Sequence, residues 1–317
     1  MFISGTGNSN SNRVCLSSEA ENLVQQAWEI RTANFPMEMT IVNPVKTKAV
    51  SVTGNTCALD CAHCGKHYLK GMRPLEAVLP GENPAEESTL EKSSLRPASY
   101  LISGGCTSQG KVPLLQHLDQ LYELKKSARL NLHTGLVTIE EAYALAAVAD
   151  VVSFDFVGSD DIIQKVYGLD KKVSDYLDSY RSLAAALGSH RVVPHVTIGL
   201  AAGKVSTEVE AVKLLAAEGI SELALLVFRP TRGTRFEKLP APDLAEVAAT
   251  MAEIRTLIPS VPINLGCMRP GGGYRSKLDL LALHCGLNKI VHPGRNFETA
   301  ARQMGLTVKY EEECCAL

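Results

Sequence analysis

The chain has 317 residues, of which 32 are Lys or Arg and 34 are Asp or Glu, so its formal net charge is −2. This balance leaves no large positive field and argues against nucleic acid or a membrane surface as a partner. No stretch approaches the roughly 18 apolar residues of a membrane-spanning helix, and residues 1–10 lack the basic and apolar regions of a secretory signal. Nine cysteines, three of them crowded together, predict a reducing cytoplasm and metal ligation rather than disulfides.

The N-terminal region predicts a flexible tail followed by a helix. Residues 4–13 are almost entirely Gly, Ser, Asn and Thr, without apolar periodicity. Ser18 and Glu21 have the spacing of a capping box, and apolar residues then recur on one helical face. We therefore expect residues 1–38 to form a tail and a helix that packs on the main domain.

From residue 48 onward, apolar runs typical of strands alternate with helical patterns. The runs cover residues 48–53, 99–103, 130–134, 151–157, 192–200, 223–229, 263–267 and 289–292. A glycine of the C-cap type follows several of the helical patterns, at Gly188, Gly219, Gly286 and Gly305. Eight strands alternating with helices predict an α/β fold, a (β/α)8 TIM-type barrel over residues 39–305. An open doubly wound sheet is the alternative, but no dinucleotide glycine fingerprint follows the first strand.

Two segments lie outside this regular pattern. Residues 72–97 are rich in Pro, Glu and Ser and are longer than most connections, so we expect a lid or a surface excursion. Residues 306–317 are expected to form a C-terminal tail that contains two cysteines and folds back over the barrel mouth. The last four residues fit a C-a-a-X prenylation pattern, but three glutamates precede them, so we discount a lipid anchor.

The main chemical signal is a group of three cysteines, Cys57, Cys61 and Cys64, within eight residues. A structural zinc site takes four ligands, usually in two halves, and this group has no second half. Cysteine thiolates also hold iron–sulfur clusters, and a cubane held by three of them keeps one iron open to another ligand. The group follows the first strand, so we expect it at the carboxyl end of the barrel, where active sites lie. A chance cluster or a partial zinc knuckle is the alternative.

The CxxxCxxC spacing, with the planar ring of His63 before the last cysteine, resembles the signature of the radical S-adenosylmethionine (SAM) enzymes. This resemblance implies that Cys57, Cys61 and Cys64 hold a 4Fe–4S cluster. Its free iron would chelate the amino and carboxylate groups of SAM. Transfer of one electron would then cleave SAM to methionine and a 5′-deoxyadenosyl radical.

The resemblance also assigns residues after later strands to the cofactor. Gly104 and Gly105 follow the second strand, where the family's backbone approaches the methionine moiety, although an ordinary turn also accounts for them. Asp155 ends the fourth strand and is expected to accept hydrogen bonds from the ribose hydroxyls, with a cap or ion-pair role as the alternative. His133 and His195 lie on strands and are compatible with either a core or a catalytic role.

Residues 265–272, 288–293 and 312–315 resemble the biotin synthase-like group that includes the split, two-protein lipoyl synthases. This resemblance implies a radical sulfurtransferase that inserts sulfur into an octanoyl chain carried on a protein lysine. The sulfur would come from a second, auxiliary iron–sulfur cluster. Its expected ligands are Cys106, Cys267, Cys314 and Cys315, with Cys15 as a substitute, whereas Cys285 lies on an apolar stripe and is expected in the core.

The expected partners follow from this resemblance. They are a lipoyl-carrier protein or octanoyl-lysine peptide, a paralogous radical SAM protein, and an electron donor such as ferredoxin or flavodoxin. A docking rim for an acidic partner is expected from Arg229, Arg232, Arg235, Arg269 and Arg275. Two alternatives remain: a biotin synthase-like enzyme with one cluster that acts on a small molecule without sulfur insertion, and a non-catalytic cluster-binding scaffold.

Overall fold

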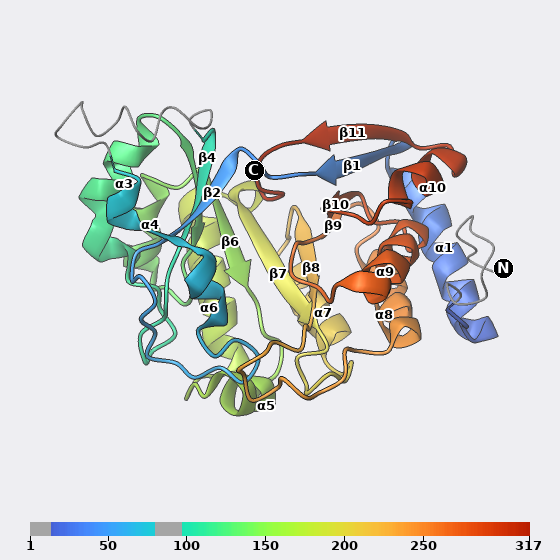
Figure 1. Cartoon of the computed structure of the whole chain (residues 1–317), viewed down its shortest axis with the longest axis horizontal. Helices are drawn as coiled ribbons and strands as arrows, with labels where there is room; N and C mark the ends of the chain where they lie inside the picture. The colour runs from blue at the N-terminus through green and yellow to red at the C-terminus, as the bar shows by residue number, and fades with distance from the viewer. Residues whose placement is uncertain (1–13, 80–96) are drawn as a thin grey trace.

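The computed structural model describes residues 14–79 and 97–317 (Figure 1). The expected flexible tail at residues 4–13 and most of the expected lid at residues 72–97 lie outside these ranges. Within them, one curled sheet carries helices on its outer face (Figure 1).

All strands of the sheet run parallel to their neighbours. In spatial order they are β11 (Thr307–Glu311), β1 (Glu38–Val42), β10 (Lys289–Val291), β9 (Ile263–Leu265), β8 (Leu223–Val227), β7 (Val192–Ile198), β6 (Val151–Asp155), β5 (Arg129–His133), β4 (Ser99–Ser103), β2 (Thr47–Ser51) and β3 (Arg73–Pro74). The eight expected strands are therefore present, and β1, β3 and β11 are added to them.

The expectation of a closed (β/α)8 barrel is wrong. The sheet ends at β11 on one side and at β3 on the other, and these two edges do not pair. Closure fails because β1 occupies the edge of β10 that β2 would need, and β11 then extends that side. The result is an open, curled sheet that forms part of a barrel.

The helices are set by local signals that the sequence carries. They are α1 (Ser18–Asn34), α3 (Leu118–Lys125), α4 (Ile139–Ala146), α5 (Asp160–Ile162), α6 (Val173–Leu187), α7 (Glu208–Ala217), α8 (Leu244–Leu257), α9 (Gly272–His284) and α10 (Phe297–Gln303). The expected first helix is confirmed, although its N-cap is Ser17. A full capping box joins Thr138 to Glu141 at α4. The four expected C-cap glycines all adopt positive φ.

The two faces of the sheet differ in composition because side chains alternate along each strand. Outward residues such as Leu132 and Phe154 join the main core between the sheet and the helices. The inward positions between them hold polar residues, such as His133 and Asp155. A small second apolar cluster lies on the inner face at the amino ends of the strands, where Val151, Val193 and Ala224 meet Ala316.

The last six residues were expected over the carboxyl mouth. They instead follow the end of β11 and lie between the ends of β1 and β10 and the amino ends of β2, β5, β6 and β7. Figure 1 shows the C-terminus near the start of β2. Cys314 donates its backbone N–H to Thr47 Oγ1 at 2.7 Å, and Lys46 donates its backbone N–H to Glu312 at 2.8 Å. An ion pair between Arg129 and Glu313 adds to this contact. The C-terminal residues therefore fill the seam beside β2 and close the amino end.

Candidate active site

The three clustered cysteines lie on the loop after β2, at the carboxyl end of the sheet, as the sequence predicts. We call residues 52–72 the triad loop. Its start is shaped by side chains, since Thr53 Oγ1 donates to Thr56 O at 2.9 Å. Further on, the backbone N–H groups of Cys64 and Gly65 both donate to Cys61 O, at 3.1 and 3.0 Å. Cys61 and Cys64 therefore lie on one tight turn.

Three neighbouring loops fix the triad loop through its backbone. Ala58 donates its N–H to Cys106 O after β4 at 2.8 Å, and Ala62 donates its N–H to Val166 O after β6 at 2.7 Å. In the other direction, Phe236 after β8 donates its N–H to Ala62 O at 3.0 Å. The loop is thus held from three sides through its backbone.

The thiols of this site lie close enough to influence one another. Burial, reinforced by Cys64, Cys106 and Cys57, raises the pKa of Cys61 to about 12. Burial likewise raises the pKa of Cys64 and brings that of Cys106 to about 12. Such thiols are neutral at pH 7, and a bound metal reverses this because its positive charge favours thiolates.

The donor set suits a cluster better than a single ion. Across the part of the chain that the structure describes, no three His, Cys, Asp or Glu side chains converge on one metal position. A single zinc ion needs its sulfurs at about 2.3 Å from one point, whereas a cubane spreads its thiolates over several irons. The triad offers three thiols, one fewer than the four ligands of a structural zinc site, and a cubane can be held by three.

Gly105 is required by the triad loop itself. A Cβ at this position would lie 1.9 Å from Thr56 O and 2.6 Å from Cys57 Cα. Its N–H donates to Thr53 Oγ1 at 2.7 Å, and the next N–H, that of Cys106, donates to Cys57 Sγ at 3.2 Å. The glycine that the sequence assigns to the cofactor therefore also seats Cys57. At Gly104 the corresponding contacts are looser, at 3.1 Å or more.

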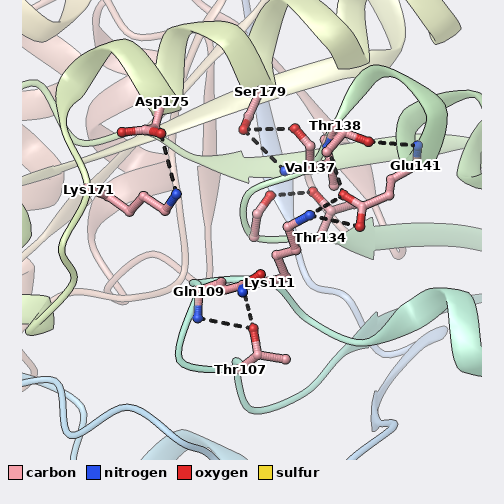
Figure 2. A network of polar contacts seen from close by, with 11 residues as sticks. Thr107, Gln109, Lys111, Thr134, Val137, Thr138, Glu141, Lys171, Asp175 and Ser179 are labelled. Carbon is pink, nitrogen blue, oxygen red and sulfur yellow. Dashed lines mark hydrogen bonds and ion pairs between the residues drawn. The ribbon is translucent and has the colours of Figure 1, made fainter.

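The loop after β4 is anchored away from the cysteines by a polar network, drawn in Figure 2. Thr107 Oγ1 accepts from Gln109 N at 3.3 Å and from Lys111 N at 3.4 Å. The Lys111 ammonium pairs with Glu141 at 2.7 Å, which ties the loop to the first turn of α4. The position of Cys106 is therefore fixed from both sides.

His63 lies in the buried part of the site. Its ring packs edge-on against Tyr167 with centroids 5.1 Å apart, and its Nδ1 is buried without a hydrogen-bond partner among the described residues. Burial lowers its pKa to about 4, against the opposite effect of Asp155. The neutral ring therefore offers one unused polar atom beside the cysteines, which is compatible with a bound group there.

Tyr167 is a site residue that the sequence analysis missed. It ends a π-helical turn, η5 (Ile163–Tyr167), before Gly168. Such turns are frequent at functional sites, but their sequence signal is weak. A cavity of about 430 Å³ opens beside it and is lined by Ala58, Leu59, Asp60, Ser108, Tyr167, Gly168 and Arg235. The triad loop thus has open space next to it.

Asp155 lies at the end of β6, as expected, and on the inner face of the sheet. Its side chain is exposed even though helices cover the other face of its strand. Its carboxylate acts electrostatically on His63, Cys106 and His133. Asp155 therefore lies between the cysteines and the strand histidines.

The expected auxiliary ligands are divided between two places. Cys106 belongs to the triad site. Cys267 follows β9, and Cys314 and Cys315 lie in the C-terminal residues, where Asn131 Nδ2 donates to Cys314 Sγ at 3.2 Å. The Cys315 thiol, by donating to Cys314, lowers the pKa of Cys314 to about 6. Burial and Cys314 together raise the pKa of Cys267, so these three thiols lie within electrostatic reach of one another.

Three further expectations concern single residues. Cys285 is fully buried, as expected for a core residue. Cys15 is exposed before α1. Arg269 cannot belong to a docking rim, because it is fully buried and pairs with Asp279 at 2.9 Å. Its other hydrogen bonds go to backbone carbonyls around β9 and β10, so it holds the end of the sheet together.

Comparisons with known proteins concern the fold. No protein-family model and no curated protein matches the sequence. The structure is similar to that of the FeFe-hydrogenase maturase HydG from Carboxydothermus hydrogenoformans, with a TM-score of 0.64 and 15% identity over 93% of this chain and 73% of that one. A second structure of HydG has a TM-score of 0.65 and 16% identity, over 94% of this chain and 70% of that one. The structure of methylornithine synthase (PylB) has a TM-score of 0.60 and 12% identity, over 93% of this chain and 91% of that one.

A helix that crosses a membrane must be long and apolar. None of the described helices is both long enough and apolar enough to cross a bilayer.

Proposed function

We propose that this chain is a radical SAM enzyme. The observation that carries the proposal is the placement of Cys57, Cys61 and Cys64 on one loop at the carboxyl end of a curled parallel sheet. The Cys61 thiol lies within electrostatic reach of Cys57 and Cys64. The CxxxCxxC spacing resembles the signature of these enzymes, and the fold is of the same kind as that of HydG and methylornithine synthase.

When bound to the three thiolates, a 4Fe–4S cluster supplies one-electron cleavage of SAM. The chain's own residues would position and shield this chemistry. Gly105 and Cys106 seat Cys57, while Asp155 presents a carboxylate to the ribose side of the cofactor. His63 and Tyr167 form a packed aromatic wall beside the thiols, which limits the access of water.

A second candidate is sulfur insertion of the lipoyl synthase type, with an octanoyl chain on a carrier protein as substrate and a paralogous protein or a ferredoxin as possible partners. The observation that favours it is the proximity of Cys267, Cys314 and Cys315. The charged and thiol groups that act on Cys106 are Cys57, Asp155 and Cys64, not these three. An auxiliary cluster would therefore need Cys267 and the C-terminal pair without Cys106.

Anaerobic iron and sulfide analysis tests both candidates. Wild type is compared with Cys57/Cys61/Cys64→Ala and with Cys314/Cys315→Ala, and each is assayed for 5′-deoxyadenosine after reduction with dithionite. We expect roughly four irons per chain in wild type and none in the triple variant. Roughly eight irons, half of them lost in Cys314/Cys315→Ala, would favour sulfur insertion. A wild type with iron but without 5′-deoxyadenosine formation would refute the proposal.

A further inference from the structure

The inner face of the sheet holds two histidines that the proposed chemistry does not use. His133 on β5 and His195 on β7 reach toward each other across β6, with ring centroids 5.7 Å apart. The two residues alternate with outward core residues such as Leu132 and Val196, so both rings project over the concave side. In the strand register His195 is the partner of Asp155, and His133 is the partner of Ser153, two residues earlier on β6.

Solvent reaches this inner surface although the outer face of the same strands is covered. Asp155 is exposed, and His133 and Thr197 are half-buried. The adjacent outward residues Phe154 and Val196 are almost completely buried. The interior of the curled sheet is therefore open beneath the cysteines, while the C-terminal residues close its other end.

The free polar atoms of the two rings are hydrogen-bond acceptors. His195 Nδ1 lies 3.0 Å from Val193 O; because a carbonyl only accepts, Nδ1 donates, and Nε2 is left without a partner among the described residues. Burial lowers the pKa of His133 to about 4, so its ring is neutral at pH 7 and one nitrogen can accept. His133 is half-buried and His195 is 7% exposed, and neither ring nitrogen is among the described buried polar atoms that lack a partner.

The charged groups of the inner face also favour a positively charged ligand. The three cations at inward strand positions of the described sheet, Arg129, Lys289 and Lys309, are paired with Glu313, Glu311 and Glu38. Asp155 forms no ion pair with any described residue. At the inward strand positions that the structure describes, the interior therefore presents a carboxylate and several acceptors but no unpaired cation, and this surface is complementary to a positive group that donates hydrogen bonds.

From this arrangement we propose that the inner face binds the substrate and selects a small amine-bearing molecule, with His195 and His133 accepting hydrogen bonds from it. This inference rests on the proposed radical SAM function and specifies its substrate class. His195 acts here as a substrate-binding residue. An octanoyl chain would leave both acceptors unpaired, so the inference favours the single-cluster candidate over sulfur insertion.

The test uses deuterium transfer from an unbiased mixture. Small molecules are extracted from cells grown in D2O and separated by cation exchange into an amine-bearing fraction and a flow-through. Each fraction is added to reduced, cluster-loaded protein with unlabelled SAM, and 5′-deoxyadenosine is analysed by mass spectrometry. A hydrogen atom taken from a labelled substrate leaves one deuterium in this product. A synthetic peptide with a perdeuterated octanoyl-lysine is tested in parallel.

We expect wild type to acquire deuterium from the amine-bearing fraction. His195→Phe should lower this incorporation about tenfold or more, because a hydrogen bond from a charged donor is lost. His195→Gln keeps an acceptor and should recover part of the incorporation. His117→Phe, on the outer surface, is the matched control. In proton NMR spectra, cluster-free protein should broaden the lines of molecules in the amine-bearing fraction. Wild type and the variants should rank in the same order as in the deuterium assay, although no reaction takes place.

Three results would overturn the inference while leaving the proposed function intact: deuterium from the flow-through or the octanoyl peptide alone, no deuterium from any source despite SAM cleavage, or equal incorporation by wild type and His195→Phe. Absence of SAM cleavage in wild type would instead remove the proposed function, and the inference with it.

Discussion

The two ends of the sheet both carry cysteines, but their surroundings differ. At the carboxyl end, four cysteines are held by backbone hydrogen bonds from neighbouring loops, and their thiols have no charged partner. At the amino end, Cys314 and Cys315 lie among partners: Asn131 donates to Cys314 Sγ, and Lys289 donates to Cys315 O at 3.0 Å. One end leaves its polar groups available for a ligand, whereas the other satisfies them and closes the fold.

The sharpest test of this contrast is Cys61→Ala. Loss of one cluster ligand should abolish iron retention and lower 5′-deoxyadenosine formation by more than about a hundredfold, since even outer-sphere partners of a metal are worth 10–100-fold. Cys15→Ala, which removes an exposed thiol, should leave both unchanged. Iron analysis and mass spectrometry measure the two effects. Full iron retention in Cys61→Ala would contradict the assignment of this end.

Gly105→Ala tests whether the triad loop is seated by packing. The new Cβ would overlap Thr56 O, so the loop must move, at a cost of about 3 kcal/mol in the free energy of unfolding. Chemical denaturation measures this change, and iron retention should fall with it. Gly71→Ala is the control, because a Cβ there meets nothing within 4 Å. Equal stability of the two variants would show that the loop does not depend on this contact.

Removal of residues 312–317 tests the amino end. The truncated protein loses the buried Cys315 and Ala316 and the hydrogen bonds across the seam, so we expect about 2 kcal/mol less stability. The cysteines at the other end should still bind iron and support SAM cleavage. Glu312→Gln alone removes one exposed ion pair with Lys46 and should leave stability almost unchanged, because solvent screens such pairs. A folded truncated protein that binds no iron would show that the two ends are coupled.

The smallest expected effect is a pH dependence that belongs to the carboxyl half. Burial lowers the pKa of both His63 and His133 to about 4, below the value near 6.5 of an unfolded chain. The unfolded state therefore binds more protons as the pH falls from about 6.5 to 4, and stability is lost in this window. We expect a loss on the order of 2 kcal/mol between pH 7 and pH 5 in urea titrations. His133→Asn should reduce this slope, and the C-terminal truncation should not.

Much of the fold can be predicted from the sequence because its signals are local. Apolar runs separated by capping residues gave the eight strands, and Thr138 and Glu141 marked a helix start that the structure confirms. The position of Cys57, Cys61 and Cys64 after a strand also follows from local order, because a residue after a parallel strand lies at its carboxyl end. These features need no knowledge of distant contacts.

Closure of the barrel and the position of the C-terminal residues are decided by contacts that local patterns do not contain. Residues 38–42 and 307–311 are short and only half apolar, so their pairing as β1 and β11 depends on a free sheet edge at β10. That pairing directs Cys314 and Cys315 to the amino end, away from Cys106. The π-turn that brings Tyr167 to His63 is likewise a tertiary feature.

The sequence by itself determined the elements, their order and the cysteine spacing, because helix caps, apolar periodicity and residue spacing act within a few positions of the chain. Only the tertiary structure decided that the sheet stays open, that the backbone of the triad loop occupies the space beside Gly105, and that His133 and His195 share the inner face of the sheet. Each of these depends on which strand edges pair and how the sheet curls, and such contacts join residues that are far apart in the sequence.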